Sequence, residues 1–147
     1  MSPNATILIV DDELGVRESL RMILKYSYQI QMAKGGEEAL KYIRENSVQL
    51  ILLDLKMPGL SGLETLREIR KTNKDVDVII VTAYGSLENV QEALACGVKD
   101  FIAKPFDASE ILHVVNRTSK KRHDILRKND LVRQIRSTYG LGGEVPR

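Results

Sequence analysis

The chain has few of the features that mark secreted, membrane-spanning or disulfide-stapled proteins. Its one cysteine, Cys96, excludes an internal disulfide. No apolar run approaches the ~20 residues that a membrane-spanning helix needs. The first residues lack the basic and apolar regions of a signal peptide, and no Gly-rich phosphate loop of the Walker type is present. We therefore expect a cytoplasmic protein without membrane contact that is held together by an ordinary hydrophobic core.

The net charge of +2 conceals a division between an acidic body and a basic tail. Residues 1–110 hold 13 Lys and Arg against 17 Asp and Glu, a net charge of −4, whereas residues 111–147 hold 9 against 3, a net charge of +6. The tail has one aromatic residue, Tyr139, and its acidic residues stand at helical spacing from its cations. We interpret the tail as a solvated helix and predict no direct contact with nucleic acid.

Short apolar runs alternate with segments of helical periodicity along the first two thirds of the chain. Runs rich in Val, Ile and Leu predict strands over residues 6–10, 28–32, 50–53, 76–82 and 98–103. The helices between them are predicted by apolar residues at helical spacing; we expect Leu94 to face the core and Arg17 to face solvent. Short helical crossovers between strands predict an α/β fold, a doubly wound, flavodoxin-like, five-stranded parallel sheet in the order 2-1-3-4-5.

Polar residues stand where the predicted strands end. They are Asp11 and Asp12 after the first strand, Asp54 after the third, Thr82 at the end of the fourth and Lys104 after the fifth. Each residue alone has a plainer interpretation, such as a helix N-terminus or a solvated turn. However, the carboxyl ends of parallel strands meet at one edge, and three crowded carboxylates are best tolerated when a cation joins them. A hard divalent ion, Mg²⁺, fits such a cluster, and Lys104 and Thr82 add a positive charge and a hydroxyl donor. The arrangement predicts a site for a phosphoryl group carried on Asp54.

The phrases Asp11-Asp12, Asp54-Leu-Lys-Met-Pro-Gly, Thr82-Ala83 and Lys104-Pro105-Phe106 resemble the receiver domain of two-component response regulators. The resemblance covers about residues 5–118. It implies that a partner histidine kinase phosphorylates Asp54, and that the chain is a signalling switch and not an enzyme.

The same resemblance implies roles for further residues. Asp12, Asp54 and the backbone carbonyl of Lys56 would ligate Mg²⁺, with Asp11 assisting through water. Thr82 and Phe101 match the switch pair of the family, in which the hydroxyl turns toward the phosphoryl group and the ring turns inward. The Lys104-Pro105 bond is expected in the cis form.

The phrases at residues 81–93 and 100–106 further resemble receivers of sigma-54-dependent transcription activators of the nitrogen-regulation type. In such proteins a linker helix leads into an ATPase domain and a DNA-binding domain. We therefore expect a receiver domain at residues 1–118 and a helical linker or tail at 119–147, truncated from a transcription-regulating output region. A stand-alone phosphorelay receiver is the alternative.

Two other classes are disfavoured. An aspartate-nucleophile phosphatase would carry an Asp-x-Asp pair after the first strand, where this chain has adjacent acids. A nucleotide-binding module would have a glycine-rich first turn, where this chain has carboxylates.

The tail predicts a long helix with an apolar seam. Residues 106–139 contain no Gly or Pro, and Asp107 offers a cap, so one helix is expected to continue to about Thr138. Polar residues 116–122 are expected to carry it clear of the domain. Apolar residues then resume, and Ile125, Asn129, Val132 and Tyr139 stand at heptad spacing with Ile135 beside them, Asn129 being the polar member of this set. We predict that a second copy of the chain covers this seam, and that phosphorylation alters the homodimer.

Overall fold

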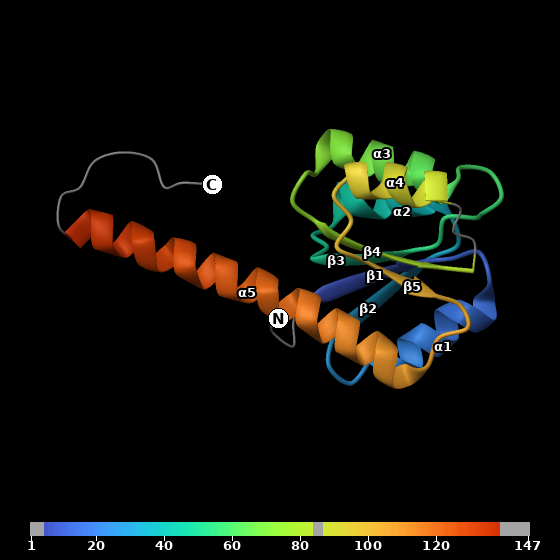
Figure 1. Cartoon of the computed structure of the whole chain (residues 1–147), viewed down its shortest axis with the longest axis horizontal. Coiled ribbons are helices and arrows are strands. Elements are labelled where there is room, and N and C mark those ends of the chain that lie inside the picture. The colour runs from blue at the N-terminus through green and yellow to red at the C-terminus, as the bar shows by residue number, and fades with distance from the viewer. Residues whose placement is uncertain (1–4, 84–86, 139–147) are drawn as a thin grey trace.

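A parallel sheet of five strands forms the centre of the computed structural model, which describes residues 5–83 and 87–138 (Figure 1). The strands are β1 (Thr6–Val10), β2 (Gln29–Ala33), β3 (Leu50–Leu53), β4 (Asp77–Thr82) and β5 (Asp100–Ala103). They lie in the order β2-β1-β3-β4-β5, and every pair of neighbours is parallel. The predicted fold class and strand order are confirmed. The last strand is shorter than predicted and begins at Asp100.

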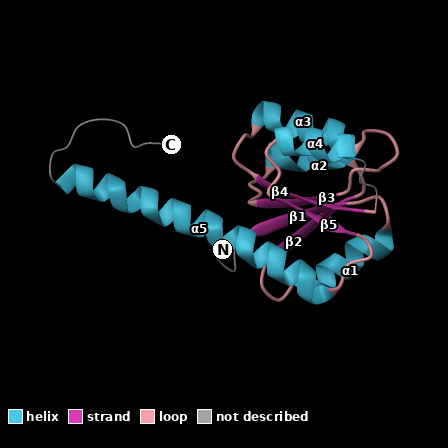
Figure 2. Ribbon diagram, in the orientation of Figure 1, coloured by secondary structure: helices cyan, strands magenta, loops and turns pink. Residues whose placement is uncertain are grey.

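Helices cover both faces of the sheet. They are α1 (Leu14–Leu24), α2 (Gly36–Glu45), α3 (Gly62–Thr72), α4 (Leu87–Ala95) and α5 (Ala108–Thr138). Figure 2 shows α2, α3 and α4 on one side of the strands and α1 and α5 on the other. None of the helices over the described residues combines the length and the apolar character needed to cross a bilayer.

The central strands are apolar on both faces because they contribute side chains to two separate hydrophobic cores. In β1, Leu8 and Val10 pack beneath α2 and α3, whereas Ile7 and Ile9 pack against α1 and α5. Successive side chains of a strand point to opposite faces, so an unbroken apolar run is what a sheet covered on both sides requires. One expectation fails here: Leu94 of α4 is 55% exposed, and the inward face of α4 is formed by Ala93.

The start of α3 brings that helix directly under the end of β3. Ser61 and Glu64 form a capping box, in which the Glu64 N–H donates to the Ser61 hydroxyl and the Ser61 N–H donates to the Glu64 carboxylate. A Cβ atom at Gly62 would lie 2.1 Å from the backbone oxygen of Asp54. Only glycine permits this approach, which fixes the short connection after Asp54.

The long helix α5 stays on the domain further than its sequence predicts. Residues 116–122 were expected to leave the surface, but Thr118 and Ser119 are buried because their small side chains let the helix lie close. Arg122 then donates from Nη1 to the Asp75 carbonyl oxygen at 2.6 Å and lies 3.6 Å from the Asp77 carboxylate.

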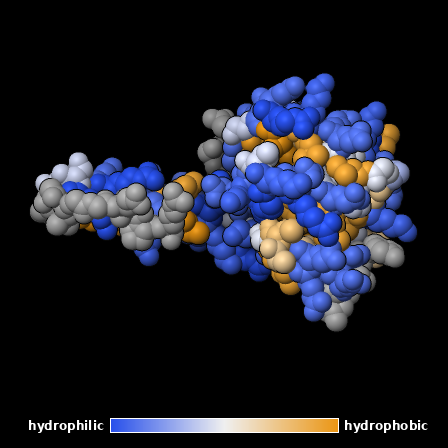
Figure 3. All heavy atoms as spheres, turned by 90° about the horizontal axis from the view of Figure 1, so that it is seen from above, coloured by the Kyte–Doolittle hydropathy of each residue, from blue (hydrophilic) through white to orange (hydrophobic). Residues whose placement is uncertain are grey.

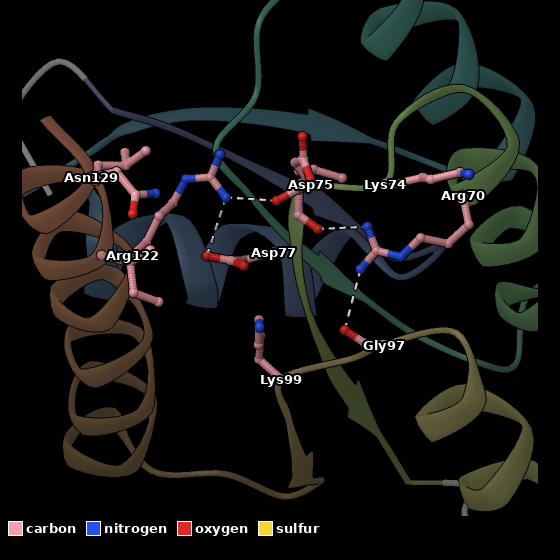
Figure 4. Close-up of a pocket in the computed structure, with 11 residues that line it drawn as sticks. Arg70, Lys74, Asp75, Asp77, Gly97, Lys99, Arg122 and Asn129 are labelled. Carbon is pink, nitrogen blue, oxygen red and sulfur yellow. Dashed lines mark hydrogen bonds and ion pairs between the residues drawn. The ribbon is translucent and has the colours of Figure 1, made fainter. Parts of the chain in front are cut away.

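We call Arg122, Asp77 and the Asp75 carbonyl the α5 clamp. Figure 4 shows Arg122 reaching these two residues from α5, while Arg70 of α3 reaches Gly97 from the other side of the cavity. Beyond the clamp the helix projects away from the domain (Figure 1).

Candidate functional site

The predicted site residues meet at the carboxyl edge of the sheet. Val10 of β1 pairs with Leu53 of β3, so the residues that follow them, Asp11 and Asp54, are neighbours. The Asp54 N–H donates to the Val10 carbonyl at 3.0 Å, which extends the ladder by one residue and holds Asp54 beside β1. Asp11 and Asp54 are almost fully buried, whereas Asp12 is exposed. This edge therefore has two carboxylates inside the fold and a third at its mouth.

Both carboxylate oxygens of Asp54 are held by donors from other segments. Oδ1 accepts a hydrogen bond from Thr82 Oγ1 at 2.7 Å and one from the Lys56 N–H at 3.2 Å. Oδ2 accepts one from Lys104 Nζ at 3.0 Å. The side chain is thus oriented by β4, by its own loop and by the segment after β5. Such a carboxylate needs little reorganisation before it reacts.

Lys104 joins the two buried carboxylates. Its Nζ lies 2.7 Å from Asp11 Oδ2 and 3.0 Å from Asp54 Oδ2, and its side chain is 13% exposed. Burial lowers the pKa of Lys104, but the bonds to the two carboxylates outweigh burial and leave its pKa above the ordinary value. Lys104 therefore remains a positive charge at neutral pH. The peptide bond that follows it, Lys104-Pro105, is cis, as expected.

The pKa of Asp11 shows the electrostatic cost of burying a carboxylate at this site. Burial raises its pKa above the ordinary value, the bonds from Lys104 and from the Glu13 N–H lower it, and the nearby Asp54 charge raises it. The net direction is upward, because burial outweighs the bonds from Lys104 and from the Glu13 N–H.

The three acids form a donor set that suits a hard cation. One carboxylate oxygen from each of Asp11, Asp12 and Asp54 lies within 4.8 Å of the others. Oxygen-only ligands with net negative charge are what Mg²⁺ prefers. The residues present therefore fit the implied ion. Lys56 lies beside this set through its N–H on Asp54, and its carbonyl stays a predicted ligand.

The predicted switch pair spans two neighbouring strands. Thr82 pairs with Ala103 in the β4–β5 ladder, and Phe101 lies two residues earlier on β5, opposite Ile80. Phe101 is half-buried and packs against the core beneath α3 and α4. The two residues thus lie on neighbouring strands, and the switching role stays a prediction.

One residue near the site was placed wrongly by the sequence. Arg17 was expected on the outer face of its helix, yet it is only 9% exposed, and its Nη1 donates to the Asp11 carbonyl at 2.9 Å. A signal was available, because Arg17 precedes the buried Leu20 and Leu24 by three and seven residues and so lies on the inward face of α1.

The comparisons with known proteins agree with this geometry. Residues 7–116 match the family described as response regulator receiver domain. Sporulation initiation phosphotransferase F of Bacillus subtilis is 40% identical over 115 residues, which are 78% of this chain and 93% of that protein. The transcriptional regulatory protein ZraR of Escherichia coli is 33% identical over 144 residues, which are 97% of this chain but only 32% of ZraR.

A solved structure is also similar over most of the chain. The response regulator protein TrrA of Thermotoga maritima, whose crystal structure is in complex with Mg²⁺-BeF, is 38% identical with a TM-score of 0.70, covering 77% of this chain and 97% of TrrA.

Proposed function

This chain belongs to the response regulator receiver domain family, and from that premise we propose that it is a signalling switch set by phosphorylation of Asp54. The phosphodonor is a partner histidine kinase, and the location is the cytoplasm. The observation that carries the proposal is the Asp54 carboxylate, buried and held between Thr82 and Lys104 among two further acids.

The residues divide the work of phosphoryl transfer. An Asp54 oxygen forms a bond to phosphorus while the bond from phosphorus to the histidine nitrogen breaks, and the electron pair of that bond stays on the imidazole. Lys104 Nζ and Thr82 Oγ1 are donors that can move from the free carboxylate to the phosphoryl oxygens. When bound by Asp11, Asp12, Asp54 and the Lys56 carbonyl, Mg²⁺ would offset the charge that accumulates on those oxygens.

Intact-mass spectrometry tests the acceptor. The chain is incubated with acetyl phosphate, and we expect one phosphoryl adduct that requires Mg²⁺ and disappears in Asp54→Asn. Asp124→Asn, which removes an exposed carboxylate from α5, is the matched control and should be phosphorylated like the wild type. An adduct that forms equally in Asp54→Asn or in EDTA would refute the assignment.

The output of the switch has two candidates. A transcription-regulating output is favoured because the likeness to ZraR extends through 97% of this chain, and so along α5 as well as the receiver. A stand-alone phosphorelay receiver is favoured by phosphotransferase F, of which this chain covers 93%. We propose the first output, with the domain division 1–118 and 119–147. The chain spans about a third of ZraR, and we propose that this segment makes no direct contact with nucleic acid.

We further propose a homodimer through the projecting part of α5. The residues that pack on the domain, such as Ile111 and Thr118, lie on one helix face, and Ile125, Asn129 and Val132 continue that face toward the projecting end of the helix. Ile125 is 59% exposed, and Ile135 beside the stripe is 45% exposed. Figure 3 shows apolar side chains on this otherwise polar helix.

We name Ile125, Asn129, Val132 and Ile135 the α5 seam. Tyr139, the last predicted seam residue, lies outside the described residues. A heptad seam buries itself against a second helix of the same kind, and one inner Asn fixes register and a two-stranded state. A second copy of this chain is therefore the partner that we propose. Phosphorylation at Asp54 would change the dimer through Thr82 and Phe101 on β4 and β5.

Analytical ultracentrifugation of the full chain tests the dimer. Ile125→Lys with Val132→Lys should give a monomer. Leu131→Lys should leave the dimer intact, because Leu131 is similarly exposed at 56% but lies on the side of α5 opposite the residues that pack on the domain. The measurement is repeated with acetyl phosphate and Mg²⁺. A wild type that stays monomeric in both states would refute the dimer and leave the acceptor role intact.

A further inference from the structure

Arg17 is a buried cation that the proposed chemistry leaves unexplained. It lies one turn into α1, on the face that carries the core residues Leu20 and Leu24, and its side chain is almost fully enclosed. A buried guanidinium is costly unless its donors are satisfied. Nη1 of Arg17 donates to the backbone carbonyl of Asp11 at 2.9 Å, so the enclosed charge is directed at the turn that carries the acids.

That turn is held at every polar atom of Asp11. The Asp11 N–H donates to the Ala33 carbonyl at 3.2 Å, which anchors the turn to the end of β2. Oδ1 accepts from the Glu13 N–H at 2.9 Å, Oδ2 accepts from Lys104, and the carbonyl accepts from Arg17. The carbonyl belongs to the peptide unit between Asp11 and Asp12. The Arg17 bond therefore restrains the rotation of that peptide unit.

The orientation of this peptide decides where Asp12 points. Asp11 is fixed by its own side-chain partners, whereas the Asp12 carboxylate is exposed and takes its direction from the backbone that carries it. Its oxygen nevertheless lies within 4.8 Å of oxygens from Asp11 and Asp54. A rotation of the peptide would move Asp12 out of this set without disturbing the core.

We propose that Arg17 is a positioning residue for the magnesium site. By donating to the Asp11 carbonyl it fixes the peptide between the two acids, and so aims the Asp12 carboxylate at the position where the cation binds. The inference rests on the proposed function, since it assumes that Asp11, Asp12 and Asp54 bind Mg²⁺. Partners outside the ligand set that orient ligands are typically worth 10- to 100-fold in metal affinity.

Electrostatics alone predicts the opposite result, and this makes the proposal easy to test. A buried positive charge near a cation site repels the cation, so its removal should tighten binding if charge were the only effect. If Arg17 positions Asp12, its removal should weaken binding. The sign of the change in Mg²⁺ affinity therefore separates the two roles.

The experiment is a calorimetric titration of the full chain with Mg²⁺, without any phosphodonor. Arg17→Met removes the donors and keeps the length of the side chain, and we expect Mg²⁺ affinity to fall by about tenfold or more. Arg17→Lys keeps a donor and should recover part of the loss. Arg21→Met is the matched control on the same helix, because Arg21 pairs with Glu18 and does not contact the turn. The Mg²⁺ affinity of Arg21→Met should equal that of the wild type.

A kinetic measurement gives a second readout. With acetyl phosphate, Arg17→Met should raise the Mg²⁺ concentration for half-maximal phosphorylation and change the rate at saturating Mg²⁺ much less. Circular dichroism establishes that each variant is folded. If Arg17→Met does not fold, Arg17→Lys carries the test and should bind Mg²⁺ more weakly than the wild type.

The outcomes separate this inference from the function on which it rests. The positioning role is overturned if folded Arg17→Met binds Mg²⁺ as tightly as the wild type or more tightly. If only Arg17→Lys folds, the same result in that variant overturns it. The acceptor role stays intact in both cases. A wild type that neither binds Mg²⁺ nor accepts phosphate overturns both.

Discussion

Replacing Arg122 with methionine tests whether the α5 clamp holds the projecting helix to the domain. The substitution removes the guanidinium and keeps an unbranched side chain of similar helix propensity. It leaves the Asp77 carboxylate, whose side chain is 7% exposed, without its ion pair at 3.6 Å. It also leaves the Asp75 carbonyl without its Arg122 donor.

The structure sets the expected size of the effect. Breaking a fully buried ion pair costs about 3–5 kcal/mol, and an exposed pair contributes about 0.2–1 kcal/mol. The clamp lies between these limits because the Arg122 side chain is 28% exposed. We therefore expect the free energy of unfolding to fall by about 2 kcal/mol, between the two limits. For a domain of this size the corresponding fall in Tm is about 4–8 °C.

The pH dependence of this loss has a defined sign. Burial raises the pKa of Asp77 above its ordinary value, and the charges of Arg122, Lys99 and Arg70 partly oppose that rise. A raised carboxyl pKa means that the folded state binds the proton more tightly than the unfolded state. The Asp77 carboxyl therefore stabilises the fold at low pH, and this stabilisation is lost as the pH rises through the folded pKa. The ion pair with Arg122 exists only above that pKa. The difference between Arg122→Met and the wild type should therefore shrink as the pH is lowered through it.

Urea unfolding followed by circular dichroism, repeated from neutral to acid pH, measures the effect. Arg127→Met, which removes an exposed cation from the same helix, should change stability by less than about 0.5 kcal/mol. Adding Asp77→Asn to Arg122→Met should restore more than half of the loss, because no unpaired charge remains buried. An Arg122→Met variant within about 0.5 kcal/mol of the wild type at neutral pH, or a double variant without recovery, would refute the reasoning.

Three further outcomes follow from the site. Thr82→Ala should slow phosphorylation of Asp54 by acetyl phosphate about tenfold, the effect of one hydrogen bond of ~1.4 kcal/mol, in an intact-mass time course. Lys104→Met should bind Mg²⁺ more tightly in a calorimetric titration, because a competing positive charge is removed, and it should be phosphorylated more slowly. Weaker Mg²⁺ binding would contradict the electrostatic argument. Gly62→Ala should lower the free energy of unfolding by about 3 kcal/mol in urea, because its Cβ would overlap the Asp54 carbonyl; an unchanged midpoint would show that the connection can move aside.

Local patterns in the sequence are enough to predict the sheet and most of the site. Unbroken apolar runs such as Leu50–Leu53 mark strands buried on both faces, and each run ends at a polar residue. In a parallel sheet the carboxyl ends of the strands meet at one edge, so the sequence alone predicts that Asp11, Asp54 and Lys104 lie close together, as they do. The capping box at Ser61 and the length of α5 are likewise local properties of the chain.

The rotation of each helix against the sheet depends on tertiary packing. A helical pattern places Arg17 and Leu94 on a face, but packing decides which side chains at the margin of that face are enclosed, and here Arg17 is buried and Leu94 is exposed. Arg122 and Asp77 are separated by 45 residues, and no local period links them. Their contact exists because the fold brings α5 and the beginning of β4 side by side. Contacts between residues far apart in sequence depend on packing and not on local pattern.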